Sequence, residues 1–246
     1  MRKFKTFSWE NAYYRICSSE LKKIKDTIIE QRQLLTEYIK LFPFFKTSLE
    51  PVVLKGEPPR IAKRMANAAL KTGTGPMAAV AGAIAQTAGE AAINAGAKEV
   101  IVENGGDIYI KSDSKVFVGL YPGKDKVSLR LSFCISPAQM PIAVCSSSSR
   151  MGHSLSFGDC DLATVVSKDA SLADATATRV CNSVKEISDI QETLEIAMDI
   201  NGIIGVLIIK DDRVGVAGKL PEIVKNIDPD IRNKITYHPD AFSFVF

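Results

Sequence analysis

A pair of glycines between two short apolar segments places the strongest constraint on how this chain can fold. Residues 102–110 read Val-Glu-Asn-Gly-Gly-Asp-Ile-Tyr-Ile, a pattern typical of two strands joined by a turn. A type I′ hairpin turn needs positive φ at both central residues, and Gly105 and Gly106 adopt such φ values at no steric cost. The segment therefore predicts an antiparallel hairpin.

The polar residues around this turn are candidates for chemistry. Glu103 and Asn104 precede the two glycines, and Asp107 follows them. A backbone without side chains lets a phosphate or a ribose approach closely, and a neighbouring carboxylate can be held towards a metal ion. A solvated turn is the alternative interpretation, because Asn, Gly and Asp are common in turns. We predict that Asn104, Gly105 and Gly106 bind ligand and that Asp107 takes part in catalysis.

Apolar spacing along the rest of the chain predicts the other helices and strands. Strands are expected at residues 2–7, 12–17, 99–103, 107–111, 115–121, 127–133, 142–145, 202–210 and 213–217, and helices at 19–42, 60–71, 77–95, 172–184 and 190–201.

The order of these elements predicts an α+β fold in which helices pack on antiparallel sheets. A ββ-αα-ββ unit, T-fold-like, is expected to occur twice, at about residues 1–111 and 112–218. The prediction depends on element order alone, because the two halves share no recognisable sequence. We expect a single domain over residues 1–246 with an irregular tail at 219–246 that contains a short final strand.

Composition narrows the class of protein. The net charge is +3, and basic residues are scattered among acidic ones without the pattern of a DNA-binding or single-strand-binding motif. The longest weakly polar stretch, residues 75–97, is interrupted by Gln86, Glu90 and Asn94, which makes it a poor membrane span. We therefore expect a small-molecule ligand, no nucleic acid and no membrane, and a possible homodimer formed through exposed strand edges.

Cysteine content and the start of the chain indicate the compartment. The five cysteines are odd in number and form no Cys-x-x-Cys pair, which favours reduced, structural thiols. The first five residues, Met-Arg-Lys-Phe-Lys, are followed by polar residues and not by the apolar run that a signal peptide would have. We expect a cytoplasmic protein.

A serine-rich segment after residue 145 has neither helical nor strand periodicity. Apolar residues alternate with its hydroxyls, which favours an ordered loop over a flexible linker. His153 is one of two histidines in the chain, and the ordinary pKa of histidine, about 6.5, suits proton transfer near neutral pH. We predict that His153 is catalytic and that four serines bind ligand, namely Ser147, Ser148, Ser154 and Ser156.

Two further features suggest binding of ions. Asp174 and Thr178 are four residues apart in a predicted helix and share a face; a carboxylate and a hydroxyl suit Mg²⁺, which keeps waters or substrate phosphates as its other ligands. A polar first helical turn is the alternative explanation, since the helix dipole favours Asp there. The glycine-rich turn at residues 72–76 leads into a helix whose first amides could bind an anion.

Four motifs together resemble the UPF0280 family, which is related to the ApbE flavin transferases. They lie at residues 75–85, 102–108, 152–158 and 173–178. The resemblance implies an ApbE-like fold and a Mg²⁺-dependent reaction that moves FMN from FAD onto a Thr or Ser of a target protein. It also implies that Asp174 and Thr178 hold the metal and that FAD or FMN is the ligand.

Two other functions stay open. UPF0280 proteins are linked with sulfur assimilation and homocysteine formation in methanogenic archaea, a role in which Cys145 or Cys160 would handle a persulfide. Gln86 stands where the resembling enzymes carry an Asp, and their Lys is also missing from this helix, which favours a non-catalytic ligand-binding scaffold. The leading expectation is an ApbE-like transferase that binds a phosphate-bearing molecule between its two halves, beside the turn at 104–107 and the loop at 146–158.

Overall fold

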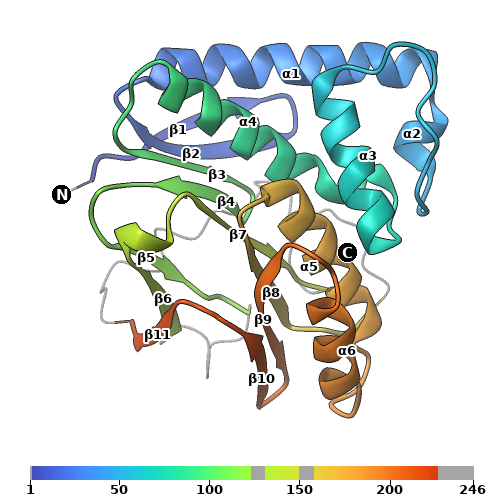
Figure 1. Cartoon of the computed structure of the whole chain (residues 1–246), viewed down its shortest axis with the longest axis vertical. Coiled ribbons are helices and arrows are strands. Elements are labelled where there is room, and N and C mark those ends of the chain that lie inside the picture. The colour runs from blue at the N-terminus through green and yellow to red at the C-terminus, as the bar shows by residue number, and fades with distance from the viewer. Residues whose placement is uncertain (1, 123–130, 150–157, 227–246) are drawn as a thin grey trace, which may run out of the picture.

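The strands pair antiparallel in two sheets (Figure 1). The computed structural model describes residues 2–122, 131–149 and 158–226. In spatial order, the larger sheet contains β1 (Lys5–Trp9), β2 (Ala12–Ser18), β3 (Val100–Asn104), β4 (Asp107–Lys111), β7 (Ile142–Ser147), β8 (Leu162–Ser167), β9 (Ile203–Lys210) and β10 (Arg213–Gly218). The smaller sheet contains β11 (Glu222–Lys225), β6 (Leu131–Ile135) and β5 (Val116–Gly119).

The larger sheet lies between a layer of helices and the smaller sheet. Strand β3 shows why, because all five of its residues are buried. Val100 and Val102 pack into the helical core, whereas Ile101 packs with residues of the smaller sheet such as Phe133. Since successive side chains of a strand point to opposite faces, a strand that is apolar on both faces needs a cover on each side.

The helices have recognisable starts and ends. Helix α3 (Arg60–Thr72) ends at Gly73, whose φ of 69° gives a left-handed cap. Helix α5 (Ala170–Ser183) begins at Asp169, whose side chain accepts hydrogen bonds from the first-turn amides. The remaining helices are α1 (Leu21–Leu41), α2 (Phe44–Thr47), α4 (Val80–Asn94) after a 3₁₀ turn at Pro76–Ala79, and α6 (Asp189–Met198). Within the described part of the chain, no helix has both the length and the apolar character needed to cross a membrane.

The structure confirms the predicted α+β class and the hairpin at residues 102–110, where Gly105 and Gly106 have φ values of 64° and 109°. One strand was missed, and two predicted strands form but lie in another sheet than expected. Strand β8 was not predicted, because its six residues are all buried and show no polar alternation. The strands predicted at 115–121 and 127–133, expected to open the second half, correspond to β5 and β6 of the smaller sheet. The repeat of two halves stays a prediction.

Helix α4 packs closely on α5 because Gly82 has no side chain. A Cβ atom at Gly82 would overlap the carbonyl oxygen of Ala170 and lie 2.9 Å from the Cβ of Asp174. The backbone of α5 leaves no room for this atom, so a larger residue must push the two helices apart.

We expect Gly82→Ala to lower the free energy of unfolding by about 2 kcal/mol, the usual effect of overpacking a tight interior. Urea unfolding measures the change. The exposed substitution Asn94→Ala in the same helix is the control and should alter stability by no more than about 0.5 kcal/mol. A Gly82→Ala protein as stable as the natural one would contradict the close approach of α4 and α5.

Candidate functional site

The carboxylates of Asp107 and Asp174 come together on facing elements. Asp107 begins β4 and is 7% exposed, and Asp174 lies in α5 and is half-buried. Cys145 of β7, the strand that pairs with β4, lies against both, because its thiol is subject to the charge of each carboxylate. The two acidic residues singled out from the sequence, 67 positions apart, therefore share one site.

Burial and mutual repulsion disfavour two charges at this site. Burial, followed by the charge of Asp174, raises the pKa of Asp107 well above its usual range, although the Cys145 thiol and the Ser146 amide donate hydrogen bonds to it. Burial also raises the pKa of Asp174 to about 7, against the effect of hydrogen bonds from the Gly82 and Ala81 amides. A bound cation would favour ionisation of both carboxylates.

One oxygen of this pair lacks a partner. Asp107 Oδ1 is buried and accepts no hydrogen bond. A buried acceptor without a partner costs about 1–3 kcal/mol, so its presence is a sign of a ligand or an ion. Mg²⁺ is commonly held by one or two carboxylates together with waters and substrate phosphates. The Asp107–Asp174 pair fits such an ion.

Further oxygen ligands would have to complete this cation site. Among the described residues, no group of three or more His, Cys, Asp or Glu side chains is arranged to hold a metal ion. Thr178 lies one helical turn after Asp174 and is half-buried. Its predicted role as a ligand stays a prediction, and the remaining ligands would be waters or oxygens of a bound molecule.

The start of α4 fixes both sides of the site. Asp174 Oδ2 accepts a hydrogen bond of 2.9 Å from the Gly82 amide, and Asn104 Nδ2 donates one of 3.2 Å to the Ala81 carbonyl. The anion at this helix start is thus the chain's own carboxylate. An external anion at residues 72–76 stays a prediction; Gly75 lies directly against the backbone of Ser48, and the Gly82 amide further along bonds Asp174.

The glycine turn leaves open space beside Asp107. A Cβ atom at Gly105 would meet no atom within 4 Å, and one at Gly106 would have the Ser146 carbonyl oxygen at 3.8 Å. The turn therefore presents bare backbone, as the sequence predicted. Binding of a ligand by Asn104, Gly105 and Gly106 stays a prediction.

The serine-rich loop is described only in part. Ser147 ends β7 and is half-buried, and Ser148 is buried next to it. The strand that carries them also supplies the Ser146 amide that bonds Asp107. Three predicted site residues, His153, Ser154 and Ser156, lie outside the described residues.

Sequence reasoning missed two residues that support the site. The Cys145 thiol donates to the Ala170 carbonyl at 3.5 Å and lies against the Asp107 carboxylate, and Gln86 of α4 accepts a 2.7 Å hydrogen bond from the Ala170 amide at the start of α5. Gln86 also donates to Glu90 at 2.8 Å. Its four-residue spacing from Glu90 on an alanine-rich helix is a detectable signal, whereas the contact of Cys145 depends on strand pairing and leaves no local signal.

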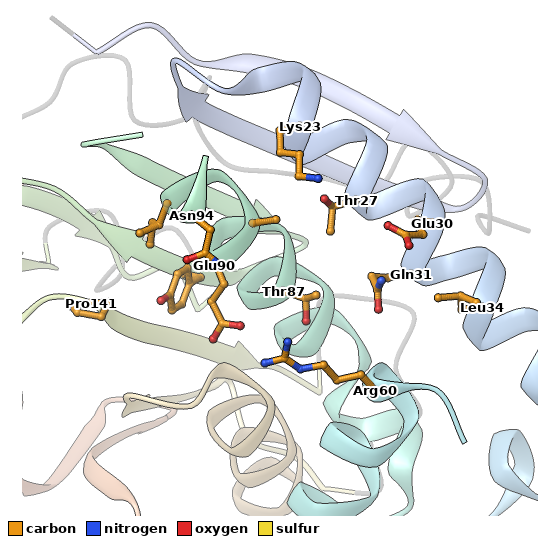
Figure 2. Close-up of a pocket in the computed structure, with 13 residues that line it drawn as sticks. Lys23, Thr27, Glu30, Gln31, Leu34, Arg60, Thr87, Glu90, Asn94 and Pro141 are labelled. Carbon is orange, nitrogen blue, oxygen red and sulfur yellow. The ribbon is translucent and has the colours of Figure 1, made fainter. Parts of the chain in front are cut away.

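A surface hollow of the size of a ligand site lies elsewhere. A groove of about 590 Å³ runs between α1 and α4 (Figure 2) and includes neither Asp107 nor Asp174 among its lining residues. Its volume is within the range of small-molecule sites. We place the candidate site at the carboxylate pair because buried, repelling charges and an unpartnered oxygen indicate chemistry more directly than volume does.

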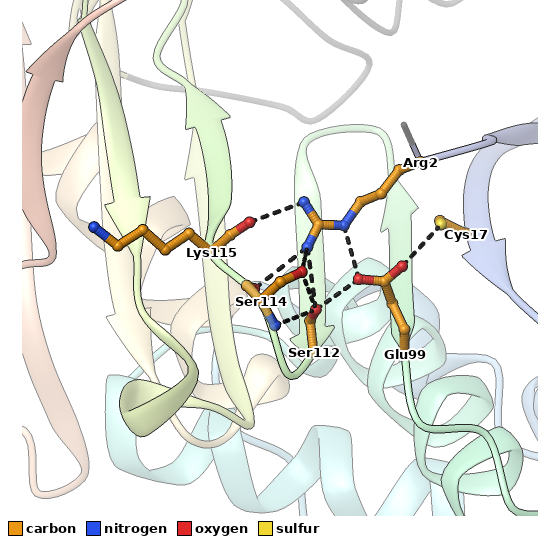
Figure 3. A network of polar contacts seen from close by, with 6 residues as sticks. All are labelled: Arg2, Cys17, Glu99, Ser112, Ser114 and Lys115. Carbon is orange, nitrogen blue, oxygen red and sulfur yellow. Dashed lines mark hydrogen bonds and ion pairs between the residues drawn. The ribbon is translucent and has the colours of Figure 1, made fainter.

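A second hollow, of about 530 Å³, adjoins a polar network around Arg2 (Figure 3). Arg2 bonds Glu99 at 2.8 Å and Ser114 Oγ at 2.6 Å. Burial alone would raise the pKa of Glu99, but hydrogen bonds from Ser112 and Arg2 outweigh it and lower that pKa. The network is internally neutralised, and it ties the start of the chain to β3 and to the connection between β4 and β5.

Comparison of sequences finds close relatives. The sequence matches the family described as AbpE bacteria over residues 16–202. A UPF0280 protein of Methanocaldococcus jannaschii is 40% identical over 209 residues, which cover 83% of this chain and 84% of the relative. A UPF0280 protein of Archaeoglobus fulgidus is 41% identical over 231 residues, covering 91% of this chain and 94% of the relative.

Comparison of structures finds the same fold at low identity. The flavin transferase ApbE from Vibrio cholerae, in a mutant form, has a TM-score of 0.55 at 13% identity and covers 88% of this chain and 97% of its own. The ApbE protein of Thermotoga maritima has a TM-score of 0.53 at 13% identity, covering 92% and 97%. Such likeness shows an ApbE-like fold.

Removing one charge from the pair should stabilise the metal-free protein near neutral pH. The unfolded pKa of Asp is about 3.9, and folding raises the pKa of Asp107 and raises that of Asp174 to about 7. Between these values the folded protein binds more protons than the unfolded one, so this pair lowers stability as pH rises. We expect Asp107→Asn to gain at least about 1 kcal/mol over the natural protein between pH 4 and pH 7.5.

Thermal and urea unfolding in EDTA across this pH range measure that difference. The exposed substitution Asp113→Asn is the control and should follow the natural protein at every pH. The outcome that would contradict this is an Asp107→Asn protein that is less stable than the natural one by the same amount at pH 4 and at pH 7.5. That result would show that the two carboxylates do not repel each other.

Proposed function

This chain belongs to the UPF0280 family, and on that premise we propose that it binds a phosphate-bearing small molecule, a flavin nucleotide, together with Mg²⁺. The observation that carries the proposal is the buried Asp107–Asp174 pair, with one carboxylate oxygen left without a partner. The shared fold with the ApbE flavin transferases of known structure supports a flavin as the ligand. We further propose that the chain forms a single domain and that its two halves meet at this site.

Different residues of the site would bind the cation and the nucleotide. Asp107 and Asp174 would hold the cation with the hydroxyl of Thr178, and the cation would neutralise phosphate charge when bound. Asp174 is kept in position by the Gly82 amide at 2.9 Å. The open side of the turn at Gly105 gives the phosphates access to backbone amides, and Ser147 and Ser148 would bind the rest of the ligand.

The proposed reaction transfers FMN. A bond between phosphorus and oxygen in the FAD pyrophosphate breaks, the hydroxyl oxygen of a Ser or Thr on a target protein bonds to the flavin-side phosphorus, and AMP leaves with the displaced oxygen. The hydroxyl proton must be removed in this step, and we assign its removal to His153.

A non-catalytic scaffold is the second candidate, and Gln86 favours it. Both ends of the Gln86 amide are engaged in structure, with the Ala170 amide at 2.7 Å and with Glu90 at 2.8 Å. The position where the resembling enzymes carry an acid therefore joins α4 to α5 here. A scaffold of this kind would bind the nucleotide without releasing AMP.

The structure opposes the persulfide role predicted for Cys145 or Cys160. Both thiols are fully buried. Burial raises the pKa of Cys145, and a hydrogen bond with Cys181 followed by burial raises that of Cys160. Sulfur transfer needs a thiolate that a substrate can reach, and both conditions are disfavoured here.

We expect FAD or FMN to bind in a Mg²⁺-dependent manner, measured by isothermal titration with FAD, FMN and ATP. Asp174→Asn, which keeps an oxygen for the Gly82 amide, should weaken the Mg²⁺-dependent binding about tenfold or more, a loss of about 1.4 kcal/mol. Asp113→Asn is the matched control and should bind like the natural protein. Binding of none of the three nucleotides, or equal binding with and without Mg²⁺, would contradict the proposal.

Release of AMP separates the enzyme from the scaffold. When the protein is incubated with FAD, Mg²⁺ and acceptor peptides that carry Ser and Thr hydroxyls, a transferase should release AMP, and Asp107→Asn should lower the rate at least about tenfold, because that carboxylate would contact the metal. Chromatography of the nucleotides measures it. Tight binding of FAD with no AMP above the background of a protein-free sample would assign the chain as a scaffold.

A further inference from the structure

The groove between α1 and α4 contains polar groups that the described part of the chain leaves without partners. Helix α1 forms one wall and α4 the other, and Arg60, the first residue of α3, lies at one end (Figure 2). A volume of about 590 Å³ is within the usual range for small-molecule sites. The polar lining groups that form no hydrogen bond or ion pair with other described residues include Lys23, Thr27, Glu30, Gln31, Arg60 and Tyr109.

Two largely buried residues carry hydroxyl groups in this lining. Tyr109 is 4% exposed and Thr27 is 5% exposed, but their hydroxyl oxygens are not enclosed by protein and form no hydrogen bond with other described residues. Both hydroxyls can therefore bond water or a ligand in the groove. Burial, followed by the charge of Glu90, raises the pKa of Tyr109 to about 12, so its hydroxyl stays a hydrogen-bond donor at neutral pH.

The charges that remain for a ligand are two positive and one negative. Glu90 is already satisfied, because Arg64 binds both of its oxygens at 3.1 and 3.0 Å. Lys23, Arg60 and Glu30 form no ion pair within the described residues, and all three are exposed. A complementary ligand would therefore carry two anionic groups and one cationic group.

The spacing of these charges fits a short extended chain. Lys23 and Glu30 lie along α1, and Arg60 lies across from them at the start of α3 (Figure 2). Seven residues separate Lys23 from Glu30, which is about 10 Å at a rise of 1.5 Å per residue. Three extended residues of a peptide span about the same length, at roughly 3.3–3.6 Å each.

We propose that this groove binds a short acidic peptide of about three residues. Its two carboxylates would pair with Lys23 and Arg60, its ammonium group with Glu30, and its backbone amides with the hydroxyls of Thr27 and Tyr109. None of these residues belongs to the carboxylate site, so the proposal does not depend on nucleotide binding.

Isothermal titration with the tripeptide glutamyl-glycyl-glycine, which has two carboxylates and one ammonium group, tests this site. Glutaminyl-glycyl-glycinamide, which has no carboxylate, is the matched probe. We expect the acidic peptide to bind with a Kd of roughly 0.1–1 mM and the amidated one at least about tenfold more weakly. Each of Lys23→Ala and Arg60→Ala should weaken acidic-peptide binding about two- to fivefold, as expected for an exposed ion pair.

Two further variants separate specific binding from general attraction. Tyr109→Phe removes only the hydroxyl and should weaken binding about threefold without lowering the Tm, and the neighbouring substitution Lys22→Ala should change nothing. Asp107→Asn should also leave peptide binding unchanged. Equal binding of the two peptides, no binding at about 5 mM, or full binding by the Lys23→Ala/Arg60→Ala double variant would overturn the proposal and identify an ordinary solvated groove.

Discussion

The enforced proximity of two buried carboxylates is the constraint on which the site depends. Asp107 comes from the first residue of β4 and Asp174 from α5, and the charge of Asp174 raises the pKa of Asp107. Both elements are held by the start of α4, through the Gly82 amide on one side and the Ala81 carbonyl on the other. The close approach of α4 and α5 at Gly82 places Asp174 against the start of α4.

This arrangement costs stability unless something else binds. Desolvation and repulsion disfavour the ionised pair, and Asp107 Oδ1 has no hydrogen bond. Sites of this kind cluster where proteins bind ions or perform chemistry. The fold shared with ApbE proteins and the open glycine turn at Gly105 give the pair a setting in which a phosphate could share a cation with it.

Local sequence patterns predicted most of the helices and strands, but not which of them pack against one another. The freedom of glycine to adopt positive φ predicted the turn at Gly105. Helical spacing correctly placed Asp174 and Thr178 in one helix, α5. Strand β8 was missed because burial on both faces removes the alternation that identifies a strand. The contact of Cys145 with Asp107 and the groove beside Tyr109 were beyond prediction, since each depends on elements that the fold brings together from distant parts of the chain.

The response of thermal stability to Mg²⁺ at pH 7.5 tests the cation site most directly. A ligand that binds only the folded state stabilises it according to its concentration relative to its Kd. If Asp107 and Asp174 hold the ion, the Tm of the natural protein should rise steadily as Mg²⁺ replaces EDTA at constant ionic strength, and the Tm of Asp107→Asn should stay constant. An equal rise in both proteins, or none in either, would contradict the account.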